Sequence, residues 1–298
     1  MSIFDRFRLE FVDCGDATLR VRVGGDGPPV LLLHGHPRTH TTWHRVAPQL
    51  AERHTVICPD LRGYGESSKP ATTPDHTPYS KRSMARDCLS LMHHLGFERF
   101  ALVGHDRGAY VAFRLAMDHP EAVERLVIMD AVPIGEALAR CTATFASAWW
   151  HWFYLGQTVK PAEPAILADP VAWYQPNRAT MGEANYQDFL RAVTNPATVH
   201  AMCEDYRAGL GVDRAADDAD LQAGRRLACP LLLIRAARDD LGDLYDDPVG
   251  IWQTWASPVQ EVVLDCGHHM AEEAPGELSQ AILAFLEEPV PTVSAPSQ

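Results

Sequence analysis

The sequence predicts an α/β fold in which a mostly parallel, doubly wound sheet carries a helical cap inserted after the sixth strand. Short apolar runs alternate with helical patterns through residues 18–129, as expected of strand–helix–strand units around a buried sheet. Between residues 133 and 226 the pattern changes to helices rich in Ala, Trp, Tyr, Asp and Pro, without β-branched runs. Apolar runs then resume, so the helical segment is predicted to be an insertion. A chain of 298 residues is long enough to bury such a core.

The individual elements are predicted in chain order. Residues 7–13 and 18–23 alternate between apolar and polar, which predicts a β-hairpin. Helical periodicity predicts helices over four segments, 43–52, 79–95, 107–118 and 275–287. Buried strands are predicted at the apolar runs 30–33, 55–58, 100–105, 125–129, 230–234 and 261–264. We therefore expect a core of residues 1–132 and 227–288, a helical cap of residues 133–226, and a disordered tail at 289–298.

Composition narrows the compartment and the partners. A net charge of −13 argues against a nucleic-acid partner, and no apolar run is long enough for a membrane span. Seven cysteines, odd in number and without a Cys-x-x-Cys pair, fit reduced thiols in a cytoplasmic protein, and the N-terminus lacks a signal-peptide pattern. The expected partner is a small-molecule substrate, with no membrane and no nucleic acid, and a homodimer stays open.

The stretch Gly104-His105-Asp106-Arg107-Gly108 stands between a predicted strand and a predicted helix. It has the Gly-x-nucleophile-x-Gly pattern of a nucleophile elbow, with aspartate as the central residue. Small residues on both sides allow the tight strand-to-helix turn, and the turn places the Asp106 side chain at the N-terminus of the next helix. The sequence therefore predicts Asp106 as a nucleophile.

Polar residues follow several of the predicted strands, and ligands bind beyond the carboxyl ends of strands in open α/β sheets. We therefore expect one cleft under the cap at which these residues meet. They are His34, Gly35, His36, Pro37, Asp60, Asp106, Asp130, Arg238, Asp239, Asp240, Gly267 and His268.

A carboxylate nucleophile favours attack on a saturated carbon that carries a good leaving group, or on an epoxide, and gives an alkyl ester of Asp106. His268 would then deprotonate a water molecule that hydrolyses the ester. The backbone N–H groups of His36 and Arg107 would stabilise the oxyanion. Asp130 and Asp239 both end strands, and either could orient His268. No metal and no cofactor is expected.

The chain resembles the α/β-hydrolase superfamily over about residues 5–288, and within it the haloacetate (fluoroacetate) dehalogenases. The resemblance implies the α/β-hydrolase fold. The motifs that carry it are His34-Gly35-His36-Pro37, Asp60-Leu61-Arg62-Gly63-Tyr64-Gly65-Glu66-Ser67, Gly104-His105-Asp106-Arg107-Gly108, Asp118-His119-Pro120, Trp150-His151-Trp152-Phe153, Asp205-Tyr206-Arg207 and Gly267-His268.

The resemblance also implies roles for individual side chains. The arginine after the nucleophile, here Arg107, would hold the substrate carboxylate. The cap residues His151, Trp152 and Tyr206 would donate hydrogen bonds to the departing halide, and all three side chains are donors. Arg107 and His151 would then make the site locally positive.

The chain departs from the family pattern at two points. The family carries a second carboxylate-binding arginine four residues after the nucleophile, where this chain has Tyr110, which would offer a single hydroxyl to the substrate carboxylate. Arg38 could compensate for the lost charge. In addition, both Asp130 and Asp239 are acidic, whereas one triad acid suffices. The family favours the position of Asp130, and Asp239 is the alternative.

Three functions compete on these observations. The first is a hydrolytic dehalogenase of a short 2-haloacid, haloacetate-like, that releases the 2-hydroxyacid and halide. The second is an epoxide hydrolase with the same Asp106 and His268, for which Tyr206 matches one of two cap tyrosines while Trp152 occupies the other position. The third is a binding protein that keeps the scaffold without catalysis, against which the intact nucleophile, base and acid argue.

Overall fold

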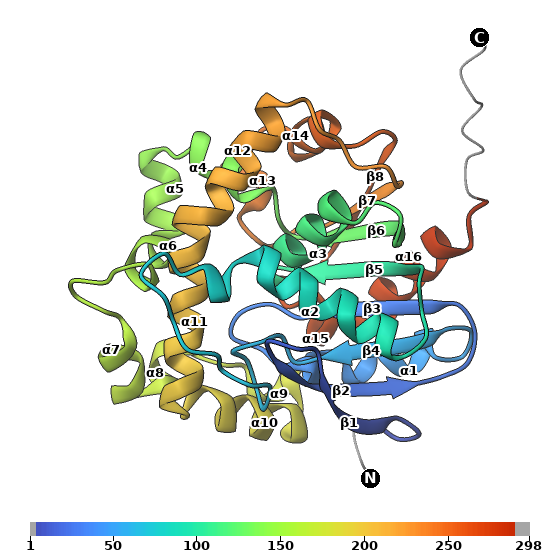
Figure 1. The fold of residues 1–298 in the computed structure, drawn as a ribbon, viewed down its shortest axis with the longest axis horizontal. Helices are drawn as coiled ribbons and strands as arrows, with labels where there is room; N and C mark the ends of the chain where they lie inside the picture. Colours follow the sequence, from blue (N-terminus) through green and yellow to red (C-terminus); the bar gives the residue numbers. More distant parts are fainter. Residues whose placement is uncertain (1–3, 290–298) are drawn as a thin grey trace.

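The computed structural model describes residues 4–289, which build eight strands into one sheet (Figure 1). The strand order is β1-β2-β4-β3-β5-β6-β7-β8. The pairs β1–β2 and β2–β4 are antiparallel and the other pairs are parallel. The strands are β1 (Arg8–Asp13), β2 (Thr18–Gly24), β3 (Pro29–Leu33), β4 (Thr55–Pro59), β5 (Phe100–His105), β6 (Val123–Met129), β7 (Leu231–Ala236) and β8 (Val259–Leu264).

Apolar residues on both faces explain why the central strands form and stay buried. In β3 and β5, Leu31 pairs with Leu102, and Leu102 in turn pairs with Leu126 of β6. Such uninterrupted apolar strands need a layer of helices on each face of the sheet. The predicted α/β-hydrolase fold with a mostly parallel sheet is confirmed.

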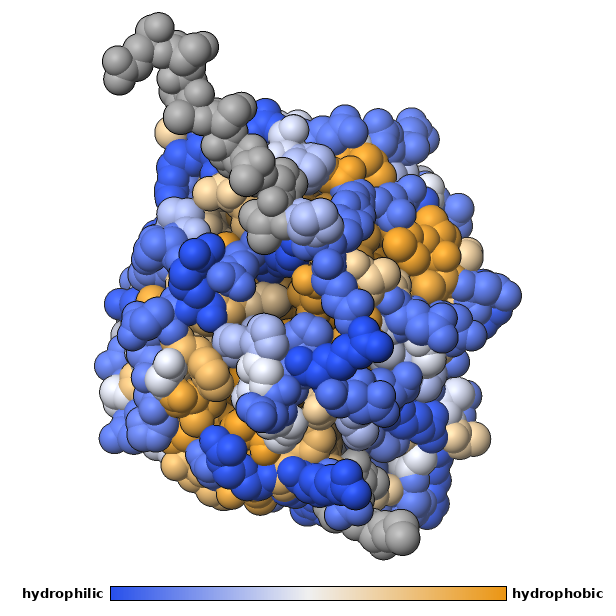
Figure 2. All heavy atoms as spheres, turned by 90° about the vertical axis from the view of Figure 1, so that its right-hand side faces the viewer, coloured by the Kyte–Doolittle hydropathy of each residue, from blue (hydrophilic) through white to orange (hydrophobic). Residues whose placement is uncertain are grey.

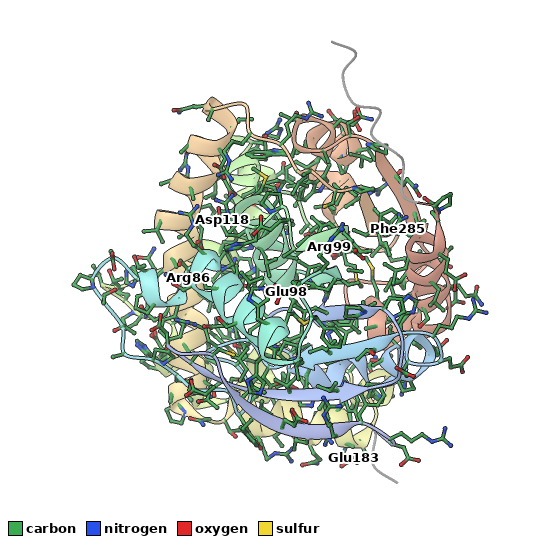
Figure 3. All side chains as sticks on the ribbon, turned by 45° about the vertical axis from the view of Figure 1, so that its right-hand side comes forward. Arg86, Glu98, Arg99, Asp118, Glu183 and Phe285 are labelled. Carbon is green, nitrogen blue, oxygen red and sulfur yellow. The ribbon has the colours of Figure 1, made fainter. Side chains whose placement is uncertain are left out.

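Helices supply both layers. One apolar core joins α2 and α3 to the sheet, and the other joins η1, α1, α15 and α16 to the opposite face. In Figure 3, the labelled Arg86 and Asp118 belong to the first layer and Phe285 to the second. The helices are η1 (His40–Arg45, 3₁₀), α1 (Ala47–Leu50), η2 (Thr77–Tyr79, 3₁₀), α2 (Lys81–His94), α3 (Arg107–Asp118), α13 (Leu241–Leu244), α14 (Pro248–Trp255), α15 (Met270–Glu273) and α16 (Pro275–Glu287).

The helices between β6 and β7 lie beyond the carboxyl ends of the parallel strands, on the left of Figure 1. We call α4–α12 the inserted helices. Their position after the sixth strand is as predicted, whereas the division into core and cap domains stays a prediction, and the predicted tail lies outside the described residues except for Pro289. They are α4 (Ile134–Ala139), α5 (Ala143–Ala148), α6 (Trp150–Leu155), α7 (Glu163–Ala168), α8 (Pro170–Tyr174), α9 (Arg178–Met181), α10 (Glu183–Val193), α11 (Pro196–Ala208), η3 (Gly209–Asp213, π-helical) and α12 (Arg214–Gln222).

The helix predicted over residues 43–52 is wrong in its form. The segment instead holds the 3₁₀ helix η1 followed by the single turn α1. Pro48 explains the break, because it has no N–H to donate to the preceding turn and therefore begins a new helix. The helices predicted over residues 107–118 and 275–287 are confirmed in full.

The outer surface is mainly polar. Figure 2 shows the face opposite the inserted helices, where hydrophilic residues surround small separate apolar patches. Within residues 4–289, no helix has both the length and the apolar character that a bilayer crossing requires. All seven cysteines are free, as the prediction of reduced thiols requires.

Candidate active site

Asp106 lies at the junction between β5 and α3, as the elbow motif predicts. Its backbone angles, φ 50° and ψ −118°, lie in a region that residues with a side chain rarely adopt. The backbone that follows β3 approaches this turn closely and restricts it. A Cβ at Gly108 would lie 2.4 Å from the carbonyl oxygen of His34. The strained turn lifts the Asp106 carboxylate out of the sheet toward the inserted helices.

The two oxygens of the Asp106 carboxylate have different surroundings. The backbone N–H of His36 donates to Oδ1 at 2.6 Å. Gly35 permits this contact, since a Cβ there would lie 2.4 Å from the same oxygen. The other oxygen, Oδ2, faces His268 Nε2 at 4.0 Å. Oδ1 is therefore held in the predicted oxyanion position, while Oδ2 is left to react.

His268 follows β8, and its Nδ1 contacts both candidate acids. The Oδ2 atoms of Asp130 and Asp239 lie 2.9 Å and 2.8 Å from Nδ1. The structure therefore brings both alternatives to the base and does not select one of them. The same three groups lie close enough together to hold a cation. However, a protonated Nδ1 that donates to carboxylates has no lone pair for a metal.

These contacts change the acidity of His268. Burial alone would lower the pKa of the imidazole, but its hydrogen bonds to Asp130 and Asp239 and the nearby charge of Asp106 raise it well above the usual value. The neighbouring His105 and His269 have the opposite shift, because burial lowers the pKa of each far below normal. His268 is therefore the one charged imidazole of this cluster at neutral pH.

A cavity of about 240 Å³ opens above Asp106 and His268. Nine residues with a predicted role at the site reach it, together with Asp240, which was expected at the cleft without a role, and three unpredicted residues, Ala148, Trp149 and His269. A wider hollow of about 660 Å³ beside residues 70–78 contacts none of these side chains. The predicted residues in the cavity wall are His36, Asp106, Tyr110, Asp130, His151, Trp152, Tyr206, Asp239 and His268.

The three predicted halide donors come from two of the inserted helices. His151 and Trp152 belong to α6, and Tyr206 belongs to α11. The Tyr206 ring lies 6.0 Å from the His151 ring and 6.5 Å from the Trp152 ring, both edge to face. Burial lowers the pKa of His151 to about 4, so this imidazole is neutral at pH 7. His151 therefore supplies no positive charge, contrary to expectation.

The predicted binding role of Arg107 needs correction in its geometry. The guanidinium does not line the cavity; it donates from Nε and Nη2 to the carboxylate of Asp205 at 3.1 Å and 3.0 Å. It lies behind the aromatic wall, 4.1 Å from the centre of the Tyr206 ring. Asp205 also accepts hydrogen bonds from Tyr64 and Lys81. Among the guanidinium nitrogens of Arg107, Nη1 is the one without a hydrogen-bond partner within residues 4–289, and the whole side chain is buried.

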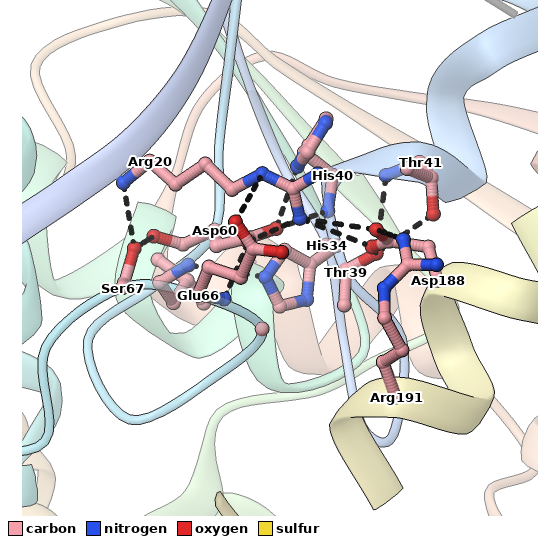
Figure 4. Close-up of polar contacts among 12 residues, drawn as sticks. Arg20, His34, Thr39, His40, Thr41, Asp60, Glu66, Ser67, Asp188 and Arg191 are labelled. Atoms are coloured by element: carbon pink, nitrogen blue, oxygen red, sulfur yellow. Dashed lines mark hydrogen bonds and ion pairs between the residues drawn. The ribbon is translucent and has the colours of Figure 1, made fainter. Parts of the chain in front are cut away.

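Arg38 and Asp60 do not reach the cavity. Arg38 binds Glu272 through Nε and Nη2, at 2.8 Å and 3.1 Å, so it cannot replace a substrate-binding arginine. Asp60 is fully buried and accepts hydrogen bonds from His40 and Arg20, as Figure 4 shows. These strand-end residues are structural because an ion-pair partner from another element binds each of them.

Trp149 was given no role from the sequence, and the structure places it in the cavity wall. Its Nε1–H donates to both oxygens of Asp240, at 2.9 Å and 3.0 Å. Asp240 was expected at the cleft, but no signal in the sequence links it to a tryptophan 91 residues away. The pair connects α6 to the loop after β7 at the edge of the cavity.

Comparisons with known proteins agree with the fold. A family model of the alpha/beta hydrolase fold matches residues 28–275. A fluoroacetate dehalogenase from Burkholderia sp. is 38% identical over 294 residues, which cover 96% of each chain. A soluble epoxide hydrolase from Corynebacterium sp. strain C12 is 32% identical over 277 residues, which cover 88% of this chain and 91% of the relative. A crystal structure described as an α/β hydrolase from Nostoc sp. PCC 7120 has a TM-score of 0.93 at 40% identity, and the match covers 96% of this chain and 100% of that one.

Proposed function

The chain belongs to the α/β-hydrolase family, on its haloacetate dehalogenase-like branch, and we propose that it hydrolyses a carbon–halide bond of a short 2-haloacid. The products would be the 2-hydroxyacid and a halide ion. The similarity to the Burkholderia fluoroacetate dehalogenase supports this proposal. The observation that carries it is the asymmetric Asp106 carboxylate, with Oδ1 held by the His36 N–H and Oδ2 facing His268.

In the first step, Oδ2 of Asp106 attacks the carbon that bears the halogen. A carbon–oxygen bond forms, the carbon–halogen bond breaks, and the halide leaves with the electron pair. His151, Trp152 and Tyr206 in the cavity wall offer neutral N–H and O–H donors, which stabilise the negative charge as it builds on the halogen.

In the second step, His268 Nε2 takes a proton from water, and the resulting hydroxide attacks the ester carbon of Asp106. Negative charge then develops on Oδ1, where the His36 N–H already donates. The N–H of Arg107, the first residue of α3, is the expected second donor. Each such donor contributes about 3–4 kcal/mol to a typical barrier reduction. The bond between the Asp106 carboxyl carbon and Oδ2 then breaks, the departing Oδ2 takes the proton from His268, and the hydroxyacid is released.

Anchoring of the substrate carboxylate is weaker here than with two free arginines. Tyr110 offers one hydroxyl in the cavity wall, and Arg107 keeps only Nη1 beyond its bonds to Asp205. A single neutral donor replaces a bidentate charged contact. We therefore expect modest discrimination, within about tenfold in kcat/KM, between a haloacetate and the corresponding uncharged haloacetamide.

The decisive test is to trap the covalent ester. In a His268→Ala variant the first step proceeds without its base for hydrolysis, so mass spectrometry of the Asp106 peptide should find an added carboxymethyl group after incubation with chloro- or bromoacetate. An Asp106→Asn, His268→Ala variant serves as the control and should stay unmodified. Halide release by the wild-type protein without any ester on Asp106 would contradict the proposed mechanism.

An epoxide hydrolase is the second candidate, because two phenols line the cavity, Tyr206 from α11 and Tyr110 from α3. Two hydroxyls near one carboxylate can donate to an epoxide oxygen while Asp106 attacks its carbon. The similarity to the Corynebacterium epoxide hydrolase supports this candidate. Diol formation from styrene oxide that exceeds halide release, and is lost in both Tyr110→Phe and Tyr206→Phe, would favour it over the dehalogenase.

A further inference from the structure

Two carboxylates meet at a single nitrogen of His268. Asp130 follows β6 and Asp239 follows β7, and these strands are neighbours in the sheet. Their carboxyl ends therefore bring both side chains to Nδ1, at 2.9 Å and 2.8 Å. An imidazole has one N–H at this position, so the two acids share a single donor.

The surroundings oppose a second negative charge on these acids. The Asp130 side chain is fully buried, and its Oδ1 accepts one further hydrogen bond, from the Ala236 N–H at 3.2 Å. Asp239 is about one quarter exposed. Two carboxylates in contact repel, and the usual result is that the pair binds one proton. The more buried acid is the better place for that proton, since water does not solvate its charge.

The acidities of the two groups agree with this assignment. Burial raises the pKa of Asp130 to about 6, and its hydrogen bond with Asp239 adds to the increase. Burial also opposes ionisation of Asp239, but its hydrogen bonds with His268 and Asp130 hold its pKa well below the usual value. Below about pH 6, Asp130 is then the carboxylic acid that donates to the Asp239 carboxylate.

We propose that Asp130 and Asp239 form one positioning unit that shares a proton and keeps a carboxylate at His268 Nδ1 when either acid is removed. The proposal rests on the proposed function only in taking His268 as the base. Instead of a choice between two triad acids, it gives a pair of acids that both contact Nδ1 and that carries one negative charge when it holds the shared proton. The unit holds the imidazole in the tautomer with a proton on Nδ1, which leaves Nε2 facing Asp106.

Other ionisable groups also surround His268, and each contributes to its titration. Asp106 lies 4.0 Å from Nε2, and the His105 and His269 rings lie 4.6 Å and 5.4 Å from the imidazole ring. The charge of His268 also acts on Asp240 and on the neutral His151. None of these groups contacts Nδ1, so changes at Asp130 or Asp239 can be separated from them.

The test compares Asp130→Asn, Asp239→Asn and the double variant. Asp265→Asn is the matched control, because Asp265 lies on the same loop as His268 but pairs with Arg238 at an exposed site. Titration of the His268 imidazole by nitrogen-15 NMR gives its pKa and its tautomer without any substrate. Halide release over a range of pH gives kcat and KM separately.

We expect each single variant to keep the Nδ1–H tautomer, to lower the pKa of His268 in part, and to lose less than about 100-fold in kcat. The double variant should lose the tautomer preference and about 1,000- to 10,000-fold in kcat, with KM changed much less. The proposal is overturned if one single variant equals the double variant while the other matches wild type. If Asp130→Asn does not fold, Asp239→Asn decides alone: a lost Nδ1–H tautomer overturns the proposal and a retained one supports it.

The same measurements separate this proposal from the proposed function. If both single variants keep the Nδ1–H tautomer of His268 but no ester forms on Asp106, the dehalogenase mechanism is refuted and the proposal for the pair stands. If the ester forms on Asp106 but only one of the two acids affects His268, the dehalogenase mechanism stands and the proposal for the pair is refuted.

Discussion

At the residue scale, the charge of Asp106 influences the charge of His268. The free enzyme has a carboxylate 4.0 Å from Nε2, and this charge helps to raise the pKa of His268. A protonated imidazole cannot accept a proton from water. In the proposed mechanism Asp106 becomes an ester and loses its charge, which would lower the pKa of His268 and make the ring a base at the step that needs one.

Asp106→Asn mimics the neutral ester and should lower the pKa of His268. A unit charge at this distance is worth about 1 kcal/mol in water and about 4 kcal/mol at an effective dielectric constant of 20, so the decrease should be about 1 to 3 units. NMR titration of the imidazole measures it. Asp265→Asn serves as the control, and an unchanged pKa in Asp106→Asn would show that the two side chains do not interact.

The sequence predicted the residues that local motifs determine. Asp106 and His36 follow from glycine-containing turns whose geometry is short-range, and both reach the cavity. The commitment of Arg107 to Asp205 could not be predicted, because the partners are 98 residues apart and meet only through packing of α11 over α3. A local motif predicts which residue lies at the site, but it does not predict which distant residue that side chain contacts.

At the element scale, α12 and the preceding turn present acids to the interior. Asp213, Asp217 and Asp220 are all buried and recur at the spacing of one helix face. Lys81 compensates the negative charge of Asp213, and Arg114 compensates that of Asp220. Asp217 has no such partner within residues 4–289, and its Oδ2 accepts only the N–H of Gly135 at 3.1 Å. The middle of this face is therefore a weak point of the helix at high pH.

Burial raises the pKa of Asp217 to about 7, far above its value in an unfolded chain. The folded state then binds the proton more tightly, so this group contributes stability that is full below about pH 4 and is lost as the pH rises through 7. Asp217→Asn should be neutral near pH 4 and stabilising by roughly 2–4 kcal/mol at pH 8.

Thermal unfolding at several pH values measures this effect. The half-exposed Asp218 on the same helix provides the control variant Asp218→Asn, which should show no such pH dependence. Equal effects of Asp217→Asn at pH 4 and pH 8 would show that Asp217 stays ionised throughout.

At the scale of the whole molecule, ion pairs join the inserted helices to the sheet. Arg20 of β2 donates to Asp188 of α10 at 3.1 Å and to Asp60 at 3.4 Å, and Thr39 donates to the same Asp188 at 2.7 Å (Figure 4). All four side chains are buried. Loss of the arginine would remove the cation that the two buried carboxylates share, and would leave the exposed Arg191 beside Asp188 and the His40 imidazole beside Asp60.

Arg20→Gln should therefore destabilise the protein by about 3–5 kcal/mol, as is typical when one partner of a buried pair is removed. Arg178→Gln is the control, because Arg178 pairs with Glu183 at an exposed site and its loss should leave the unfolding midpoint nearly unchanged. Equal midpoints for the two variants would show that the Arg20 network does not hold the inserted helices.

The overall arrangement was largely predictable because it depends on repeated short-range patterns. Apolar runs fixed the strands, and the change of composition at residue 133 marked the insertion. The contacts of Arg20 were not predictable, since its partner Asp188 is 168 residues away and a charged residue in a strand is normally exposed. Pairings of this kind depend on how distant elements dock.

The hydrogen bond from the His36 N–H to Oδ1 keeps the two carboxylate oxygens of Asp106 distinct through repeated turnovers. In the proposed mechanism Oδ2 departs with each product and an oxygen from the solvent replaces it, whereas Oδ1 stays in place. In heavy-oxygen water the Asp106 peptide should therefore gain one heavy atom and never a second, however many cycles it completes. Double labelling would mean that the carboxylate rotates between cycles. With rotation prevented, the nucleophile keeps one oxygen from its own biosynthesis and renews the other at every turnover.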